Sequence, residues 1–151
     1  FLVIPRHNTN ATLRDLYKMT IEDHQFEEVR ILSLQPDDPT ERLTIATLRA
    51  IAPATVVPVT GQTTLLTEIE AAQAILCQRF HGALAALARG KDVHICPMAP
   101  GDKLAALEAA VSTGRVEALV QEWREEAEQG EAALGQALHR LENKRSLPKG
   151  L

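Results

Sequence analysis

One short segment of this chain, Arg79-Phe80-His81-Gly82, has the residue types and spacing of an anion-binding site. The apolar stretch before it, 74–77, is typical of a buried strand, and the Ala/Leu-rich stretch after it, 83–88, is typical of a helix. Two cationic side chains would then lie beside unpaired N–H groups at the positive end of the helix dipole. Because phosphates and carboxylates bind in such places, we predict an anion site at Arg79 and His81.

The elements that must position this segment alternate regularly along the chain. Strands are predicted over 1–4, 29–34, 55–59, 74–77 and 92–96, and helices over 11–24, 39–52, 65–72, 83–88 and 103–111. Each crossover helix between parallel strands must cover a face of the sheet. The sequence therefore predicts an α/β fold, a Rossmann-like doubly wound parallel sheet of about five strands with flanking helices and strand order 3-2-1-4-5.

This strand order brings two cationic loops to one crevice. The first and fourth strands become neighbours at the switch point, where the loops diverge at the carboxyl ends of the strands. The loop after the first strand carries Arg6 and His7, and the loop after the fourth carries Arg79 and His81. We expect these two cationic loops to converge on one cleft.

Spacing and end signals predict several details of the helices. Asp38, Pro39 and Glu41 are typical of a helix start, with an N-cap, a proline at N1 and an acid at N3, and Asp102 is a candidate N-cap for the last helix. A turn is expected at 61–63, and Gly90 suits the left-handed position after a helix. Helical spacing places Leu13, Leu16 and Tyr17 together, Leu43, Ala46, Thr47 and Ala50 on one face, and Leu65, Leu66, Ile69 and Ala72 inward.

Composition excludes some classes of partner. A chain of 151 residues with 45% hydrophobic but only 3% aromatic residues indicates an aliphatic core. A net charge of −4 with scattered Lys and Arg argues against a nucleic-acid surface. We find no apolar run of about 18 residues and no signal-peptide pattern, so we expect no membrane span. A cytoplasmic location is predicted, with peripheral attachment to a membrane left open.

Cysteine and histidine spacing predicts neither a disulfide nor a metal site. Cys77 and Cys96 fall in predicted buried strands, which is typical of small core residues. His94 and Cys96 form too small a cluster for zinc, and the other histidines lack the spacing of metal ligands.

We expect two parts, a donor-binding domain over 1–112 and a helical extension over 113–151. The extension has an apolar stripe of Val116, Leu119, Val120, Trp123, Leu134, Leu138 and Leu141. It either packs on its own domain or braces an absent N-terminal domain or a second copy, so a homodimer stays open. The chain starts inside a predicted strand without an initiator Met, and we expect it to be half of a larger protein.

The run from Ala74 to Gly90 resembles the Arg-x-His segment of polysaccharide pyruvyl transferases. The resemblance extends back through 56–61 and the helix that contains Glu68, so it covers most of 1–111 as a C-terminal half. Those enzymes resemble two-domain GT-B glycosyltransferases and move pyruvate from phosphoenolpyruvate onto two hydroxyls of a sugar, forming a ketal. This chain differs at 90–92 and 98–103, where members usually have Gly-x-Pro and Tyr-Asp-Pro-Lys.

The resemblance implies roles for four residues. Arg79, Arg6 and Lys103 would bind phosphoenolpyruvate, since Arg can grip a phosphate or carboxylate through parallel charge-assisted hydrogen bonds. His81 would bind the donor or transfer a proton, a task for which histidine is well suited near neutral pH.

The resemblance also implies partners. The donor would be phosphoenolpyruvate with no further cofactor, and the acceptor would be a saccharide or lipid-linked saccharide of cell-envelope or exopolysaccharide biosynthesis. The acceptor would rest on the absent N-terminal domain. We expect the segment alone to be inactive, because a cleft between two domains would be only half built.

Other interpretations stay open. A GT-B nucleotide-sugar glycosyltransferase shares the scaffold, but it would need an acidic ribose contact near the start of the site helix, where this chain has His81. A third interpretation is a non-catalytic assembly module whose C-terminal helices recruit a partner. At the level of single residues, Arg79 could instead cap or pair near the sheet edge, and His81 could be structural.

Overall fold

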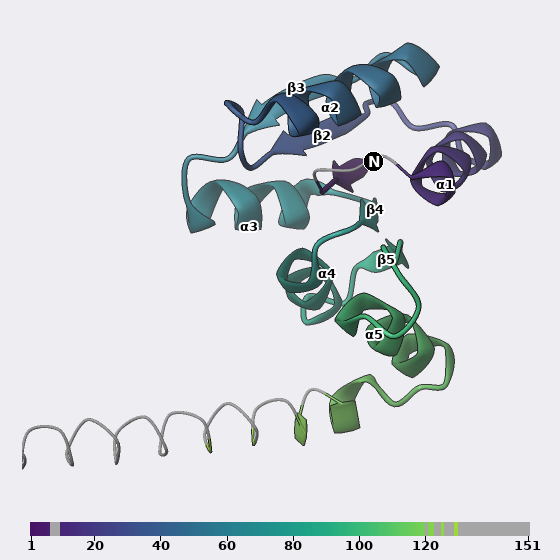
Figure 1. Ribbon diagram of the computed structural model, residues 1–151, viewed down its shortest axis with the longest axis vertical. Coiled ribbons are helices and arrows are strands. Elements are labelled where there is room, and N and C mark those ends of the chain that lie inside the picture. The colour runs from purple at the N-terminus through teal and green to yellow at the C-terminus, as the bar shows by residue number, and fades with distance from the viewer. Residues whose placement is uncertain (7–9, 120, 123–124, 126–128, 130–151) are drawn as a thin grey trace, which may run out of the picture. The chain divides into compact units, whose positions relative to one another are not determined.

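Strands and helices alternate along the chain in a computed structural model, which describes residues 1–6, 10–119, 121, 122, 125 and 129 (Figure 1). The strands are β1 (Leu2–Ile4), β2 (Arg30–Ser33), β3 (Thr55–Pro58), β4 (Ala74–Cys77) and β5 (Asp92–Ile95). The helices are α1 (Ala11–Asp23), α2 (Pro39–Ile51), α3 (Gln62–Ala71), α4 (Phe80–Leu87) and α5 (Lys103–Ser112). The alternation predicted from the apolar runs is confirmed.

The five strands form one parallel sheet with the order β3-β2-β1-β4-β5. Leu2 of β1 pairs with Arg30 on one side and with Ile75 on the other, so β1 is the central strand. All residues of β1 and β4 are buried, whereas the edge strands β3 and β5 are partly exposed. Continuous apolar burial is typical of a parallel sheet covered on both faces. The predicted Rossmann-like doubly wound fold and its strand order are therefore confirmed.

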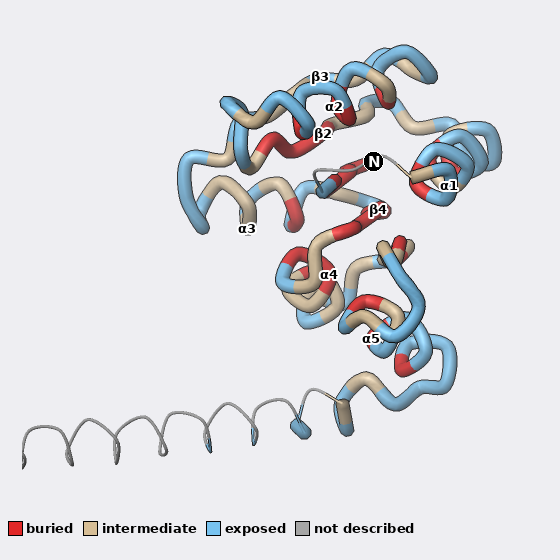
Figure 2. Tube along the Cα trace, in the orientation of Figure 1, coloured by how far each residue is buried: buried red, intermediate tan, exposed pale blue. Residues whose placement is uncertain are grey.

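The core packs against the sheet through the inner sides of the helices, which are red in Figure 2. One buried cluster joins Val3, Ile31 and Leu76 of the sheet to Leu13 and Tyr17 of α1 and Leu48 of α2. Leu13 and Tyr17 are fully buried, as their spacing predicted, and Leu16 packs at the margin of the cluster. Burying side chains of this size contributes about 1.5–3 kcal/mol each.

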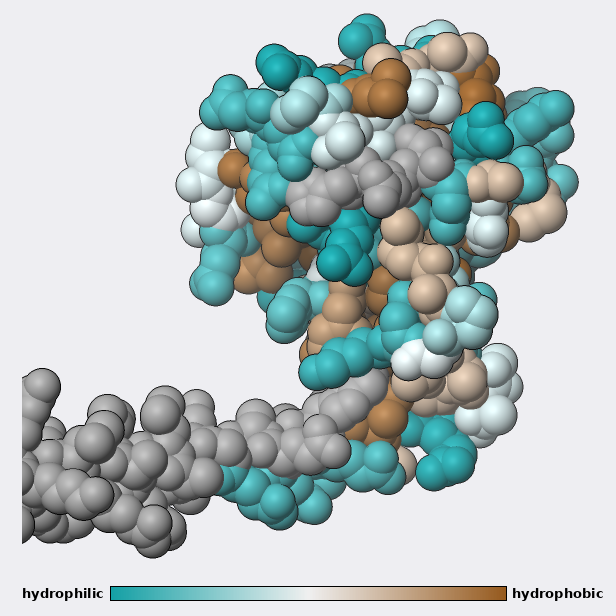
Figure 3. All heavy atoms as spheres, viewed as in Figure 1, coloured by the Kyte–Doolittle hydropathy of each residue, from teal (hydrophilic) through white to brown (hydrophobic). Residues whose placement is uncertain are grey.

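Helix α2 packs through a different face from its most regular apolar stripe. Leu43 is 67% exposed, and Ala46 and Ala50 are also exposed. The buried residues of α2 are Glu41, Thr44, Ile45 and Leu48. Glu41 lies on the same buried face as Ile45 and Leu48, and its carboxylate has hydrogen-bond partners there, as described below. In the space-filling view, hydrophobic residues interrupt the hydrophilic surface in the region of α2 (Figure 3).

Two helices begin earlier than the sequence predicts. Helix α3 begins at Gln62, within the predicted turn, and α4 begins at Phe80 with Arg79 as its N-cap. The prediction was wrong at these ends because apolar periodicity marks buried positions, and both helices begin with residues that are exposed or half-buried, Gln62 and Thr63 in α3 and Phe80 and His81 in α4. His81 therefore lies within the first turn of α4. Gly90 does adopt the expected left-handed conformation, with φ of 64°.

Gly82 allows α4 to approach the sheet closely. A Cβ atom at this position would lie 3.1 Å from Cys77 Sγ and 3.2 Å from Ile4 Cδ1, and both of those side chains are fully buried. We expect Gly82→Ala to lower the free energy of unfolding by about 1 kcal/mol, because overpacking costs more than the helix propensity of alanine restores. Urea unfolding measures the change. The same substitution should cost less in a Cys77→Ala background, and an equal cost in both would contradict this explanation.

The two cysteines are free thiols in the core, as predicted. Burial raises the pKa of the Cys77 thiol to about 12, so it stays protonated at neutral pH. Cys77 Sγ donates to the carbonyl of Arg79 at 3.1 Å, which places the thiol directly beneath the turn that leads into α4.

Contacts divide the chain into two compact units, residues 1–108 and 109–151. The division falls within α5, four residues before the boundary expected from the sequence. Most of the apolar stripe of the predicted extension, from Val120 onward, lies outside the described residues, as do His7 and His139. Among the described residues, no helix is both long enough and apolar enough to cross a membrane.

Candidate functional site

A cavity of about 450 Å³ opens at the carboxyl ends of the strands. Its lining includes Arg6 after β1, Arg79 and His81 at the junction of β4 and α4, and Lys103 at the start of α5. The sheet order brings these loops together, because β1 and β4 are neighbours and β5 lies next to β4. All four residues that the sequence proposes for the site therefore line one cavity. Their roles in binding and catalysis stay predictions.

Two of these cations have no acidic partner among the described residues. Arg6 and Lys103 are exposed, and within the described part of the chain neither forms an ion pair. Lys103 Nζ lies 5.8 Å from the centre of the Phe80 ring, an arrangement that favours a cation over the aromatic face. His81 is also exposed and contacts the same ring edge-on. The positive charge of Arg6 and Lys103 is available to an anionic ligand.

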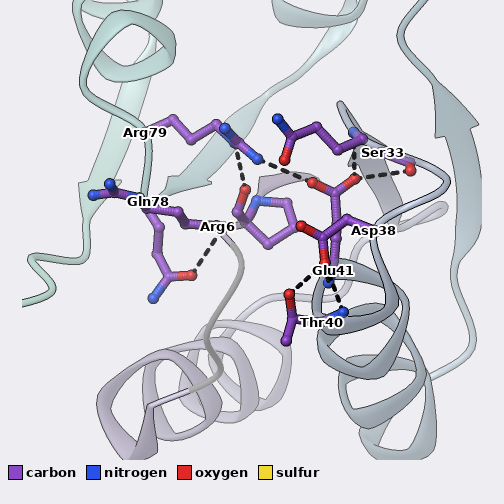
Figure 4. A network of polar contacts seen from close by, with 9 residues as sticks. Arg6, Ser33, Asp38, Thr40, Glu41, Gln78 and Arg79 are labelled. Carbon is purple, nitrogen blue, oxygen red and sulfur yellow. Dashed lines mark hydrogen bonds and ion pairs between the residues drawn. The ribbon is translucent and has the colours of Figure 1, made fainter.

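Arg79 is bound by the protein itself (Figure 4). Its Nε donates to the carbonyl of Pro5 at 2.8 Å, and its Nη2 donates to Glu41 Oε2 at 2.9 Å. The Arg79 side chain is only 20% exposed and that of Glu41 is fully buried. Hydrogen bonds to the described residues leave Nη1 unused. Contact between Arg79 and a ligand therefore stays a prediction, and it would have to use the remaining donors.

Glu41 is a site residue that the sequence reasoning missed. Asp38 caps α2 as predicted, accepting from the N–H of Thr40 at 2.7 Å. Glu41 turns inward instead, and its Oε1 accepts from Ser33 Oγ at 2.9 Å and from the N–H of Gln35 at 2.8 Å. The Glu41 carboxylate thus bonds directly to the segment at the end of β2 and to Arg79 after β4. Through Arg79 it is also linked to the loop after β1. A usable signal was present, because Glu41 lies four and seven residues before the buried Ile45 and Leu48.

Gln78 is the second residue that was missed. It follows the apolar strand β4 and is only 1% exposed. Its Oε1 accepts from the N–H of Arg6 at 3.1 Å, and its Nε2 lies 3.2 Å from Met98 Sδ. A polar residue at the end of an otherwise apolar strand, beside the predicted site, was the available signal.

Asp102 holds the loop that leads to Lys103. Its Oδ1 accepts from the N–H of Ala105 at 2.7 Å, which confirms the predicted N-cap. Its Oδ2 accepts from the N–H groups of Met98 at 3.0 Å and Ala99 at 3.2 Å. Although Asp102 lines the cavity, its carboxylate oxygens are engaged by the backbone.

These contacts predict how Asp102 affects stability. Burial acts to raise the pKa of Asp102, but hydrogen bonds from Ala105, Met98 and Ala99 outweigh it, so the pKa lies below its ordinary value. We expect Asp102→Ala to cost about 1 kcal/mol of unfolding free energy at pH 7. Because the pKa of Asp102 is lower in the folded protein than in the unfolded chain, the ionised carboxylate stabilises the fold at pH values above the pKa of the unfolded chain, near 3.9. This stabilisation is lost as the pH falls through the pKa of the folded protein. The difference between wild type and variant, measured by urea unfolding, should therefore shrink below about pH 4. A difference that stays constant down to acidic pH would contradict the assignment.

Glu68, in the helix that forms part of the family resemblance, lies away from this cavity. It pairs with Arg30 at the start of β2 through two contacts of 2.7 Å, and its side chain is 12% exposed. Hydrogen bonding of the Arg30 guanidinium to the Glu68 carboxylate is the main reason that the pKa of Arg30 is raised. This pair braces the opposite end of the sheet.

No family model matches this sequence, and searches of curated proteins and of solved structures find no significant match. The fold and site define a class, a doubly wound parallel α/β protein with a cationic cavity at its switch point. Among the described residues, no group of three or more His, Cys, Asp or Glu side chains could hold a metal ion.

Proposed function

We propose that the cavity binds phosphoenolpyruvate and that this chain is the C-terminal, donor-binding half of a polysaccharide pyruvyl transferase. The observation that carries the proposal is the gathering of Arg6, Lys103 and His81 around one cavity beside the start of α4. These side chains come from the loop after β1 and from the first turns of α4 and α5, which are separate segments of the chain. The resemblance of 74–90 to the Arg-x-His segment supports the same activity.

The charges suit a small ligand with two anionic groups. Phosphoenolpyruvate carries a phosphate and a carboxylate on a three-carbon frame. Arg6 and Lys103 supply positive charge that no described acidic residue pairs, and the helix dipole of α4 adds a partial positive charge at the same place. A volume of about 450 Å³ leaves room beside the donor for the reacting hydroxyls of a sugar.

His81 is the proposed proton-transfer group. The methylene carbon of the donor takes up a proton to become a methyl group, and the oxygen of one sugar hydroxyl bonds to the adjacent carbon. The oxygen of the second hydroxyl then displaces phosphate from that carbon, and each hydroxyl releases its proton. An exposed imidazole at the edge of the cavity is placed to deliver or accept these protons.

A nucleotide-sugar glycosyltransferase is the second candidate, because Leu34, Leu65 and Phe80 give the cavity an apolar wall that suits a base. Such an enzyme needs a carboxylate for the ribose. The two nearby candidates are occupied, since Asp102 caps α5 and Glu41 is buried against Arg79. The charge pattern therefore favours phosphoenolpyruvate.

Titration calorimetry with phosphoenolpyruvate and, separately, with a uridine-diphosphate sugar distinguishes the two candidates. A half-built cleft should bind near millimolar, about −4 kcal/mol, so concentrated protein is needed. We expect saturable binding of phosphoenolpyruvate alone. Binding of the nucleotide sugar without a response to phosphoenolpyruvate would overturn the proposal in favour of glycosyl transfer.

Removal of either unpaired cation should weaken binding of the donor. We expect Arg6→Ala and Lys103→Ala each to raise the dissociation constant for phosphoenolpyruvate about tenfold or more, because a charged hydrogen bond contributes about 1.5–3 kcal/mol. Lys18→Ala is a matched control, since Lys18 is an exposed lysine paired with Glu22 on α1. An equal loss in the control would show that the effect reflects overall charge and not the site.

A further inference from the structure

We infer that Gln78 is a positioning residue of the anion site and that it acts by fixing the backbone of Arg6. The inference rests on the proposed function only in requiring that the cavity binds anions. Gln78 has no charge to offer a ligand, and it is 1% exposed. Gln78 is among the residues that line the cavity, but it exposes almost no surface there, so its influence passes through the groups that its amide contacts.

The contacts of Gln78 fix the orientation of its side-chain amide. Oε1 accepts from the N–H of Arg6 at 3.1 Å (Figure 4). Nε2 faces sulfur atoms, Met98 Sδ at 3.2 Å and Cys96 Sγ at 3.8 Å. The backbone N–H of Gln78 continues the sheet by donating to Ile4 at 2.9 Å. Because the N–H of Gln78 is bonded to Ile4 at the end of β1, its side chain can hold in place the residues that follow β1, including Arg6.

Arg6 needs such a support more than the other cations do. Lys103 begins α5, and Asp102 caps that helix through the N–H of Ala105 and holds the preceding loop through the N–H groups of Met98 and Ala99. Arg79 is held by Pro5 and Glu41. Arg6 has already left β1 and its side chain makes no hydrogen bond to the described residues. The peptide bond between Pro5 and Arg6 is held from two sides, by Arg79 at the Pro5 carbonyl and by Gln78 at the Arg6 N–H. Among the described residues, Gln78 is the side chain that accepts from this N–H, so its loss frees the Arg6 side of the peptide bond.

The amide also satisfies a backbone donor that would otherwise lose its partner. In Gln78→Met, a side chain of similar volume fills the same space, but it offers the N–H of Arg6 no strong acceptor. The loop gains conformational freedom, and a ligand must then order it on binding. We expect the dissociation constant for inorganic phosphate to rise about fivefold to tenfold.

A double-mutant cycle separates positioning from a general structural role. Phosphate binding is followed by NMR titration of the wild type, Gln78→Met, Arg6→Ala and the double variant. If Gln78 acts through Arg6, the double variant should bind phosphate within about twofold of Arg6→Ala alone. In a Lys103→Ala background, Gln78→Met should keep its full effect, because Lys103 is fixed independently.

Two further measurements keep the result interpretable. Ile69→Val, a conservative change in the buried part of α3, shows whether loss of stability alone weakens binding, and we expect no change in phosphate affinity. Hydrogen exchange of the Arg6 amide should be faster in Gln78→Met, while that of Ala105, which Asp102 holds, stays unchanged.

The outcomes distinguish the inference from the proposed function. Multiplicative effects of Gln78→Met and Arg6→Ala, or unchanged phosphate affinity in Gln78→Met, would overturn the inference and leave pyruvyl transfer standing. Binding of phosphate without binding of phosphoenolpyruvate would overturn the proposed function, and the cycle would still test Gln78. If the wild type binds neither anion, both are overturned, because there is then no site to position.

Discussion

Glu41→Ala should lower the free energy of unfolding by about 3–5 kcal/mol, because it leaves a partly buried guanidinium without its counter-charge. Glu41 is fully buried and bonded to Arg79, Ser33 and Gln35. Alanine would remove the acceptors of all three donors and open a cavity at the carboxyl ends of the strands. Domains of this size are stable by about 5–15 kcal/mol, so the variant should lie near the limit of folding.

Urea unfolding of a small set of variants tests this prediction. Glu41→Gln keeps an acceptor for Ser33 and Gln35 and should cost less than alanine. Arg79→Met alone leaves a buried carboxylate unpaired, whereas Arg79→Met with Glu41→Gln removes both charges and should recover part of the loss. We expect a coupling free energy of about 1–3 kcal/mol between the two positions.

The Arg30–Glu68 pair provides a matched control for the buried pair. Arg30 is 35% exposed, so Glu68→Ala should cost about 1 kcal/mol or less. If Glu41→Ala costs no more than Glu68→Ala, the Arg79–Glu41 pair does not brace the site in the way proposed. The comparison also bears on any test of Arg79 as a ligand-binding residue, because an Arg79 variant that unfolds would lose binding for a trivial reason.

His81→Gln should lower the turnover of pyruvyl transfer about 10²-fold to 10⁴-fold, the usual range for a positioned proton-transfer group. The test requires this chain together with the N-terminal half that the proposal demands. Glutamine keeps a hydrogen-bonding side chain at the cavity but cannot carry a proton between donor and acceptor. We therefore expect the dissociation constant for phosphoenolpyruvate to change by less than about threefold. Phosphate release measures turnover, and calorimetry measures binding.

His94→Gln is the control for this substitution. His94 is a half-buried histidine on β5 and does not line the cavity. Its replacement should leave turnover unchanged. If His81→Gln also left turnover intact, the catalytic assignment would fail while a binding role for His81 could survive.

Much of the fold could be predicted because its signals are local. The β-branched and apolar strands, the Asp38 and Asp102 caps and the left-handed Gly90 each follow from side-chain size, hydrogen-bonding capacity or backbone freedom within a few residues. The alternation of strands and helices then restricts the topology, since crossover connections are right-handed and cover the sheet. The convergence of Arg6 and Arg79 follows from that topology alone.

The sequence by itself determined the sheet, its order and the set of cations that meet at its carboxyl edge. Only the tertiary structure decided how those cations are used. Arg79 is neutralised by Glu41 from a helix 38 residues away, and Arg6 is held by Gln78 across 72 residues. Hydrophobic periodicity predicts which positions are buried. It does not predict which residue a buried polar side chain will pair with, because that partner is set by packing between distant segments. The same reason explains why the face of α2 that carries Glu41 is buried, while the more regular apolar face that carries Leu43 is exposed.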